Sequence, residues 1–359
     1  MSAGSGSWRG RRVLVTGHTG FKGGWLCHWL RWLGAEVHGL ALDPPTEPNL
    51  FSVARVGEAL AADVRADIRD ADAVLRAMRA AAPEVVFHLA AQPLVREGYR
   101  DPLGTLATNV IGTANVLEAA RQTPSLRAIV VVATDKVYEN QEIAAPFRET
   151  DPLGAHDPYS ASKAAAEIVA ASYRLSFFSK PGDARIASAR SGNVIGGGDW
   201  AKDRLLPDCF AAFAAGQPAR LRYPNAVRPW QHVLEPLAGY IELAERLLDD
   251  TATGVDRAWN FGPDAEGDVS VSTLAKLAAE IWGPPASVVV EPQQDQPHEA
   301  GLLRLDSTLA RTALDWTPRW YLRTAVAKTV AWQKAWMSGA DMSAETLKQI
   351  ESYEREMLA

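Results

Sequence analysis

The chain has 359 residues, of which 47% are hydrophobic, enough to bury the core of one large domain or two smaller ones. Its net charge of -6 gives no basic footprint for nucleic acid, and no apolar run approaches the roughly 20 residues needed to span a membrane. Two distant cysteines, Cys27 and Cys209, make no disulfide framework, which fits a reducing cytoplasm. Residues 1–10 lack the apolar stretch of a signal peptide and are expected to be a flexible tail.

Short apolar runs alternate with helical patterns along the first half of the chain. The predicted strands cover residues 12–16, 37–42, 85–90, 128–133 and 186–190, and the predicted helices cover residues 23–33, 70–81, 102–121 and 159–178. This alternation predicts an α/β fold with a doubly wound parallel Rossmann sheet. Trp25, Trp29 and Trp32 recur at helical spacing and are expected to form a buried stripe on the first helix.

The pattern changes near residue 192, where loops rich in Gly and Pro precede further helices at about 234–249, 272–282 and 321–338. This half is expected to form a smaller C-terminal substrate-binding cap over the carboxyl edge of the sheet. The expected division gives the Rossmann domain residues 11–191 and about 228–262, and the cap about 192–227 and 263–340.

A glycine-rich turn lies between the first strand and the first helix. Gly17, Gly20 and Gly23 occur at the spacing that permits a tight turn and close approach of a pyrophosphate, with the helix N-terminus directed at the phosphates. Thr19, Phe21 and Lys22 complete the turn, and the Lys22 amine could attract phosphate. The context favours a dinucleotide site over a simple tight turn.

Asp43 follows Gly23 by 20 residues, at the end of the second strand, where a carboxylate accepts the adenosine ribose hydroxyls. An acid there would repel a 2'-phosphate and so favours NAD over NADP, although Asp43 could instead be a turn residue before two prolines. The other expected cofactor contacts are Asp67, Ile68, Leu89, Ala90, Ala91 and Thr108. Asp67 could instead be a solvated acid in a loop. His88 is expected to be a hydrogen-bonded core residue.

Proton-carrying groups gather in two further segments. Tyr159 and Lys163 share one helix face at i, i+4, so the ammonium could lower the Tyr pKa. Thr134, Asp135 and Lys136 end an apolar strand, at the sheet edge where α/β proteins bind ligands. An exposed charged turn is the alternative for Asp135 and Lys136. Together the two sets of groups suggest a reaction with further proton transfers beside a single oxidation.

With these residues assembled, the chain resembles the nucleotide-sugar 4,6-dehydratases of the extended short-chain dehydrogenase/reductase superfamily, and most of all their CDP-glucose branch. The resemblance covers nearly all of the chain after the tail. Its most specific segments are TGHTGFKG at 16–23, LDPPTEP at 42–48, HLAAQPLVR at 88–96, GNVIGGGDW at 192–200 and RPWQHV at 228–233.

The resemblance implies an NAD-dependent lyase that makes CDP-4-keto-6-deoxyglucose from CDP-glucose by transient C4 oxidation, C5/C6 water elimination and hydride return. Tyr159 would take the 4-hydroxyl proton, helped by Thr134, while Lys163 holds the ribose. Asp135 would protonate the departing 6-hydroxyl. Lys136, found where dTDP-glucose relatives carry Glu, would be the C5 base or would stabilise the enolate.

The resemblance also places the substrate and a partner. The expected substrate contacts are Gln92, Asn193, Arg204, Arg222, Arg228 and His298. Among them, Arg228 is the main candidate for binding the diphosphate. No metal is expected, and the helices at 102–121 and 159–178 are expected to pair in a homodimer or higher homo-oligomer. The alternatives are a dehydratase for another nucleotide-glucose, a nucleotide-sugar 4-epimerase, which would not need Asp135 and Lys136, and a non-catalytic NAD-binding protein.

Overall fold

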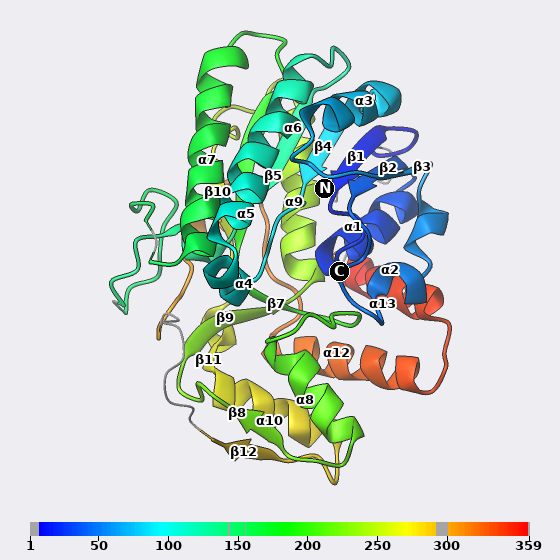
Figure 1. The fold of residues 1–359 in the computed structure, drawn as a ribbon, viewed down its shortest axis with the longest axis vertical. Helices are drawn as coiled ribbons and strands as arrows, with labels where there is room; N and C mark the ends of the chain where they lie inside the picture. Colours follow the sequence, from blue (N-terminus) through cyan, green and yellow to red (C-terminus); the bar gives the residue numbers. More distant parts are fainter. Residues whose placement is uncertain (1–6, 143, 155, 292–300, 358–359) are drawn as a thin grey trace.

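A seven-stranded parallel sheet forms the centre of the molecule in the computed structural model, which describes residues 7–142, 144–154, 156–291 and 301–357 (Figure 1). The strand order is β10-β6-β5-β4-β1-β2-β3. The strands are β1 (Arg12–Thr16), β2 (Glu36–Ala41), β3 (Ala62–Arg65), β4 (Val85–His88), β5 (Ala128–Val132), β6 (Arg185–Ser191) and β10 (Ala258–Phe261). The predicted fold class is confirmed.

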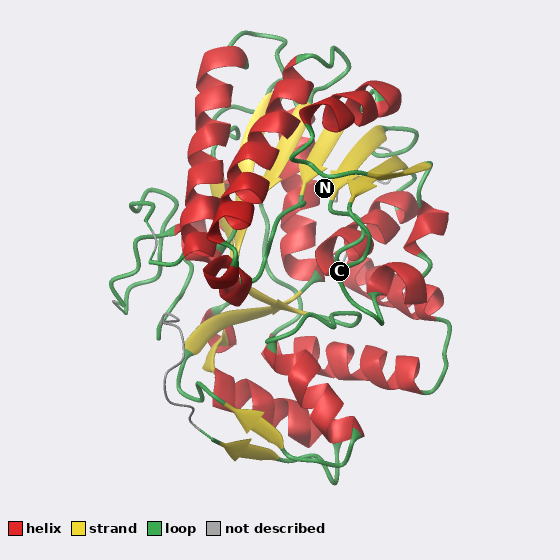
Figure 2. Ribbon diagram, viewed as in Figure 1, coloured by secondary structure: helices red, strands yellow, loops and turns green. Residues whose placement is uncertain are grey.

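Helices cover both faces of this sheet because alternate strand residues point to opposite sides. Val13 and Val15 of β1 pack into the core shared with α1 and α9, whereas Leu14 between them packs into the core shared with α3 and α6. Figure 2 shows the strands in yellow between these red helices. The helices around the sheet are α1 (Phe21–Trp32), α2 (Leu50–Val53), α3 (Ala71–Ala81), α4 (Val95–Arg100), α5 (Pro102–Leu106), α6 (Gly112–Arg121), α7 (Pro158–Phe177), α9 (Leu234–Leu248), α11 (Thr308–Ala313) and α13 (Met342–Met357).

A second hydrophobic core lies at one end of the molecule, below the sheet in Figure 1. Its small sheets follow the orders β11-β9-β7 and β12-β8. The elements here are β7 (Asn193–Ile195), α8 (Leu205–Ala214), β8 (Ala219–Leu221), β9 (Val227–His232), β11 (Asp268–Ser270), α10 (Val271–Trp282), β12 (Val288–Val290) and α12 (Leu322–Met337). The helices expected in this half are therefore present.

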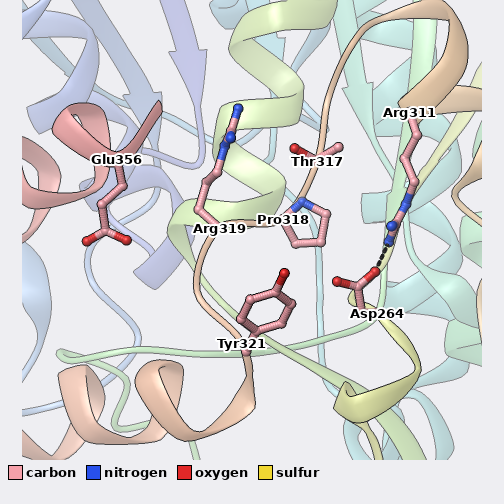
Figure 3. Close-up of a pocket in the computed structure, with 7 residues that line it drawn as sticks. All are labelled: Asp264, Arg311, Thr317, Pro318, Arg319, Tyr321 and Glu356. Carbon is pink, nitrogen blue, oxygen red and sulfur yellow. Dashed lines mark ion pairs between the residues drawn. The ribbon is translucent and has the colours of Figure 1, made fainter. Parts of the chain in front are cut away.

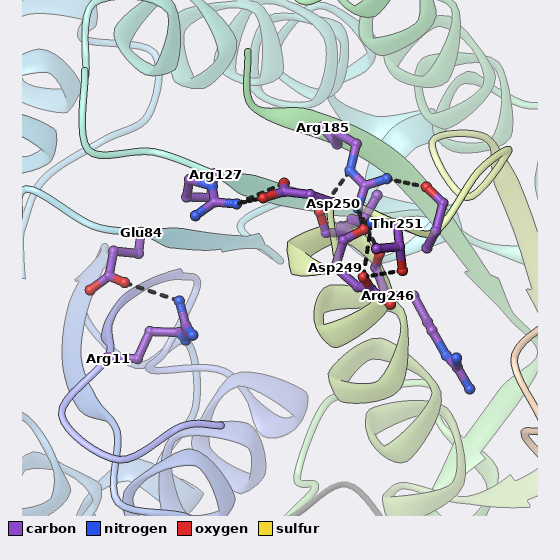
Figure 4. A network of polar contacts seen from close by, with 10 residues as sticks. Arg11, Glu84, Arg127, Arg185, Arg246, Asp249, Asp250 and Thr251 are labelled. Atoms are coloured by element: carbon purple, nitrogen blue, oxygen red, sulfur yellow. Dashed lines mark hydrogen bonds and ion pairs between the residues drawn. The ribbon is translucent and has the colours of Figure 1, made fainter. Parts of the chain in front are cut away.

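Arginines tie together the amino-terminal edge of the main sheet (Figure 4). Arg185 opens β6, and its guanidinium donates to the carbonyls of Leu247 at 2.7 Å and Arg246 at 2.8 Å, at the C-terminal end of α9. These carbonyls have no partner within the helix, so the cation satisfies them and complements the helix dipole. Arg127, at the start of β5, pairs with Asp250 at 2.8 Å. The opposite, carboxyl edge is the one that carries the predicted site.

The structure corrects three details of the sequence analysis. Trp8 is fully buried and its indole donates to Glu245 at 2.5 Å, so the expected flexible tail is wrong at residue 8. Trp32 is 41% exposed, so only two of the three expected tryptophans on α1, Trp25 and Trp29, are buried. The helix expected at 102–121 is α5 and α6 joined by a wider π-helical turn at Ala107–Ile111.

Strand β3 was not predicted, because its four residues alternate between partly buried and exposed at the sheet edge. Within the described ranges, no helix has the length and apolar character needed to cross a membrane.

Candidate active site

The end of β5 carries a compact set of polar groups. Thr134 is the N-cap of a short turn, Asp135–Val137, and its hydroxyl donates to Asp135 Oδ1 at 3.0 Å. Lys136 Nζ lies 3.3 Å from the same carboxylate oxygen. Asp135 is fully buried, and its other oxygen, Oδ2, has no hydrogen-bond partner among the described residues. A buried carboxylate oxygen without a partner is costly unless a ligand or water meets it.

Tyr159 and Lys163 face this turn from the first turns of α7. The helix begins there because Asp157 accepts a hydrogen bond from the Ser160 backbone at 2.9 Å and Pro158 occupies the first helical position. The Tyr159 side chain hydrogen bonds with Thr134, and Lys163 Nζ donates to the Val132 carbonyl at 2.7 Å. The structure therefore brings all five predicted catalytic residues to one edge.

Burial dominates the electrostatics of this pair. It raises the pKa of Tyr159 to about 12, with the Thr134 hydrogen bond opposing the rise, and it lowers the pKa of Lys163 to about 8. Without ligands the pKa of Tyr159 is therefore raised rather than lowered, because burial outweighs the charges near it. In this state the Lys163 ammonium donates to the Val132 carbonyl, so a lowering of the Tyr159 pKa by Lys163 stays a prediction for the complex with ligands.

A buried ion pair fixes α7 to the sheet one turn beyond Lys163. The Glu167 carboxylate accepts hydrogen bonds from two guanidinium nitrogens of Arg190 on β6, at 2.8 and 2.6 Å, and both side chains are at most 4% exposed. Arg190 also donates to Tyr138 at 2.8 Å. The sequence analysis did not identify this pair, because nothing in the local pattern shows that two residues so far apart will meet.

The glycine turn fits a dinucleotide. Gly17 has φ +79°, and a Cβ there would lie 2.7 Å from the Ala90 backbone nitrogen, so only glycine lets β1 and the β4 loop approach so closely. Thr19 ties the turn to the end of β2 by donating to the Leu42 carbonyl at 2.9 Å. Gly20 caps α1 without a side-chain hydrogen bond, and the first turn of α1 carries no acid. The helix N-terminus is therefore suited to an anionic phosphate.

The expected adenosine end is far more open. The Asp43 side chain is 90% exposed and lies 3.5 Å from Arg65, just past the end of β2. Asp67 is paired with Arg69, which lowers the pKa of the Asp67 carboxyl, and Ile68 is buried against Gly112. The remaining expected cofactor residues are half-buried, and they are Phe21, Leu89, Ala90, Ala91 and Thr108.

Asn109 is a polar residue of this region that the sequence analysis missed. It is 1% exposed, accepts a hydrogen bond from the Gln92 backbone at 2.8 Å and donates to Ser162 at 2.8 Å. It thus joins the loop after β4 to α7. The sequence offered little signal for it, because Asn109 is one of several polar residues in the predicted helix at 102–121. His88, as expected, is a buried residue hydrogen bonded to two threonines, and burial lowers its pKa to about 3.

The predicted substrate residues are distributed unevenly. Asn193 opens β7, and its Oδ1 is buried without a partner among the described residues. Arg204 is close enough to the catalytic edge for its charge to lower the pKa values of Tyr159 and Lys22. Arg222 pairs with Asp203 at 2.8 Å, and Arg228 is 6% exposed on β9.

Gln92 is less available than expected, since its amide nitrogen donates to Thr105 at 2.9 Å and its amide oxygen accepts from the Leu94 backbone at 2.6 Å. His298 lies outside the described residues.

A separate cavity of about 420 Å³ opens beside the segment before α12 (Figure 3). It is lined by Asp264, Arg311, Thr317, Pro318, Arg319, Tyr321 and Glu356. None of these residues belongs to the predicted site, and Asp264 and Arg311 already neutralise each other at 2.6 Å. In the parts of the chain that the structure describes, no cluster of three His, Cys, Asp or Glu side chains could hold a metal ion.

Comparison with known proteins agrees with this arrangement. The family model for GDP-mannose 4,6 dehydratase matches residues 14–329. The CDP-glucose 4,6-dehydratase of Salmonella typhimurium is 45% identical over 350 residues, which cover 96% of this chain and 97% of that protein.

Among solved structures, an epimerase from Methanothermobacter thermautotrophicus has a TM-score of 0.79 at 24% identity, covering 93% of this chain and 95% of its own. The dTDP-glucose 4,6-dehydratase of Bacillus anthracis, in complex with NAD, has a TM-score of 0.74 at 20% identity, covering 90% and 96%. At these identities the two structures support the fold alone. The family-model match and the extent of the Salmonella relative show that this chain belongs to the GDP-mannose 4,6-dehydratase family.

Proposed function

We propose that this protein is an NAD-dependent lyase that converts CDP-glucose to CDP-4-keto-6-deoxyglucose and water. The observation that carries the proposal is the position of Asp135 and Lys136. They lie beside Thr134, whose hydroxyl also meets Tyr159, so an acid and an amine adjoin the Tyr and Lys of an oxidation site. An enzyme that only oxidises and re-reduces C4 has no need of this second pair. The 45% identical relative, which acts on CDP-glucose by name, supports the same nucleotide here.

The chain offers a complete set of groups for NAD. The glycine turn would hold the pyrophosphate, Asp43 the adenosine ribose, Asp67 and Ile68 the adenine, and Lys163 the second ribose. When bound, NAD supplies the acceptor for the C4 hydride and the donor that returns it to C6. The cofactor contacts proposed for this chain are Gly17, Thr19, Gly20, Phe21, Lys22, Gly23, Asp43, Asp67, Ile68, Leu89, Ala90, Ala91, Thr108, Tyr159 and Lys163.

Tyr159 accepts the proton of the sugar 4-hydroxyl in this scheme, and Thr134 donates to the same sugar oxygen after its hydroxyl turns away from Asp135 Oδ1. Their mutual hydrogen bond places both hydroxyls where one oxygen atom could meet them. Because the pKa of Tyr159 is about 12 without ligands, the phenolate must be favoured by added positive charge. The Lys163 ammonium would supply that charge once it leaves the Val132 carbonyl for the ribose.

Asp135 and Lys136 serve the elimination. The 4-ketone acidifies the C5 hydrogen, Lys136 removes it as a base or stabilises the enolate, and Asp135 protonates the departing 6-hydroxyl. Thr134 and Lys136 engage Oδ1 of Asp135, which leaves Oδ2 for the 6-hydroxyl. With Lys136 as the base, it gains the C5 proton while Asp135 gives one to the departing hydroxyl, so the two residues together keep the same number of protons. When the hydride returns to C6, a proton returns to C5, and the Lys136 ammonium would supply it.

The substrate diphosphate needs cations, and arginine binds it bidentately. We propose Arg228 as its main contact, with Arg204 beside the catalytic edge and Asn193 at the sugar. Gln92, Arg222 and His298 complete the proposed substrate set. The cap elements that carry most of these residues would form the second wall of the site.

The decisive test is incubation with CDP-, dTDP-, UDP- and GDP-glucose, with the 4-keto-6-deoxy product followed in each. We expect product from CDP-glucose. Product from only one of the other nucleotide sugars would show that the enzyme recognises a nucleobase other than cytosine. A C4 epimer formed without loss of water would show that the protein is an epimerase and not a dehydratase.

The role of Lys136 is tested by solvent deuterium exchange at C5. Lys136→Ala should abolish exchange at C5 while the C4 oxidation persists, because the oxidation depends on Tyr159. Lys136→Arg separates the two roles, since arginine can stabilise an enolate but cannot serve as a base at neutral pH. Normal exchange and turnover in the alanine variant would remove Lys136 from the reaction.

We also propose that two copies of the chain associate through α5, α6 and α7. Large apolar side chains are exposed on these helices, with Leu103 at 78%, Ile168 at 60% and Leu175 at 71%. Figure 1 shows α6 and α7 side by side at one side of the sheet. An extended apolar surface of this kind is typical of an interface. Sedimentation should give a dimer at micromolar concentration, and Ile168→Glu with Leu175→Glu should give a monomer. A wild-type monomer would contradict the proposal.

A further inference from the structure

Lys22 does not project from the glycine turn toward solvent. Its Nζ donates to Ser191 at 2.7 Å, at the end of β6, and lies 3.4 Å from the hydroxyl of Tyr240 on α9. The Tyr240 hydroxyl also donates to Ser191, at 3.0 Å. Tyr240 is fully buried and Ser191 is 2% exposed. The ammonium is therefore fixed beneath the carboxyl edge by two buried hydroxyls.

The charges around Lys22 show where this ammonium lies. The pKa of Lys22 is lowered to about 7, mainly by burial and also by the charges of Arg204, Lys163 and Lys136, while Asp135 opposes the change. These groups come from the turn after β5, from α7 and from the segment before α8. Lys22 thus begins in the turn proposed for the pyrophosphate and ends next to the residues proposed for catalysis.

We propose that Lys22 sets the balance between the two redox forms of the bound cofactor, by placing a positive charge beside the nicotinamide end of the groove. The inference rests on the proposed NAD site. A dinucleotide that runs from Asp43 past the glycine turn to Lys163 would pass beside the Lys22 ammonium, because Lys22 belongs to that turn and its charge interacts with those of Lys163 and Asp135. The oxidised nicotinamide ring is a cation and the reduced ring is neutral. Lys22 therefore opposes the oxidised form more than the reduced one.

The consequence for the reaction follows from its electron balance. Oxidation at C4 breaks the C4–H and O4–H bonds, and the hydride carries two electrons to the nicotinamide while the proton goes to Tyr159. The ring loses its positive charge in this step. A fixed cation at Lys22 then favours the first oxidation, which must precede the elimination.

The test compares the affinities of the protein for NAD⁺ and NADH by calorimetric titration at pH 6, where Lys22 is protonated. Removing the charge by Lys22→Met should lower the ratio Kd(NAD⁺)/Kd(NADH) by about tenfold. For a two-electron couple that change equals about 30 mV. Lys22→Gln, which keeps a donor for Ser191, should lower the ratio equally, and it also serves if the Met variant fails to fold. Lys22→Arg keeps the charge and should leave the ratio within about twofold of wild type.

Lys328 offers a matched control on α12. Its ammonium donates to a serine, Ser352 at 3.1 Å, as that of Lys22 donates to Ser191. It lies 4.6 Å from the centre of the Trp320 ring, as that of Lys22 lies 5.7 Å from the centre of the Tyr240 ring. Lys328→Met should change thermal stability without moving the ratio. An unchanged ratio in Lys22→Met would overturn the inference, and so would an equal loss of both affinities, which would make Lys22 a phosphate contact. Absence of binding of either form to the wild-type protein would instead contradict the proposed cofactor.

Discussion

The two ends of the proposed cofactor groove differ in how much of their geometry the protein itself supplies. At the catalytic end, Asp135 is fully buried, and Lys163 and Tyr159 are 7% and 8% exposed. At the adenosine end, the Asp43 side chain is 90% exposed and its nearest cation, Arg65, is 30% exposed. A buried site is arranged before any ligand arrives, whereas an exposed carboxylate acquires a fixed position only in the complex. Substitutions at the catalytic end should therefore affect the reaction rate and the stability of the fold. Substitutions at the adenosine end should affect only the affinity for NAD.

The sharpest contrast is expected from Tyr159→Phe. Loss of the hydroxyl should lower kcat by about 10²- to 10⁴-fold, the usual contribution of a positioned acid or base. NAD affinity should stay within about threefold. Steady-state kinetics with a cofactor titration measure both. Tyr173→Phe, on the same helix, is the control and should leave kcat unchanged. A kcat near wild type in Tyr159→Phe would contradict the proposed role.

The buried ion pair beneath the catalytic end should dominate stability. Glu167→Gln leaves the Arg190 guanidinium buried without its carboxylate, so the free energy of unfolding should fall by about 3–5 kcal/mol. Denaturant unfolding measures this value. Glu118→Gln breaks a pair with Arg121 at a similar N–O distance, 2.7 Å, but on the surface, and should cost no more than about 1 kcal/mol. Equal losses in both variants would mean that burial does not separate the two regions.

A smaller effect is expected at the exposed end. Asp43→Ala should weaken NAD binding by about tenfold, the worth of hydrogen bonds to a charged group. Saturating NAD should restore kcat, because the carboxylate lies far from the reacting carbons. Asp72→Ala, an exposed acid on α3, is the control in the same titration. Unchanged affinity would remove Asp43 from the cofactor site.

The smallest effect is expected from Arg65→Ala. Arg65 pairs with Asp43 at 3.5 Å and with Asp63 at 2.8 Å, and it lies over the Phe51 ring at 4.5 Å. Contacts of such partly exposed side chains contribute little, so the free energy of unfolding should change by at most about 1 kcal/mol and NAD affinity by less than about threefold. Thermal unfolding and cofactor titration check the two values. A loss as large as that of Asp43→Ala would show that Arg65 positions the carboxylate, and the adenosine end would then be as preorganised as the catalytic end.

Local pattern was enough to predict five of the seven strands of the sheet, all except β3 and β10, and the polar residues at its carboxyl edge. Buried parallel strands such as Val85–His88 and Ala128–Val132 are continuous apolar runs, and the glycine spacing identifies the turn after β1. Asp135 follows β5 directly and Tyr159 opens α7, the helix that returns from the same edge, so their proximity was predictable. Which of those side chains bind ligand stays a prediction.

Long-range contacts were not predictable in this way. Lys22 was expected to face phosphate because its neighbours in sequence do, but Ser191 and Tyr240, 169 and 218 residues away, direct it to the catalytic edge. Trp8 is buried because Glu245, 237 residues away, accepts its N–H. The π-helical turn before α6 also has no local signal. In each case the tertiary partner, not the local sequence, decides the conformation.

The last helix covers the first one. The Trp29 indole on α1 donates to Glu354 on α13 at 2.6 Å across 325 residues of sequence, and its ring meets Tyr353 at 5.5 Å. During synthesis at roughly 5–20 residues per second, Glu354 is added about 16 to 65 seconds after Trp29. Through that interval the nascent chain carries α1 without the helix that covers its Trp29 side, while α2 and α9 are already available to pack against the rest of its apolar face. Helix α13 thus completes the packing of the helix that carries the glycine turn only late in synthesis.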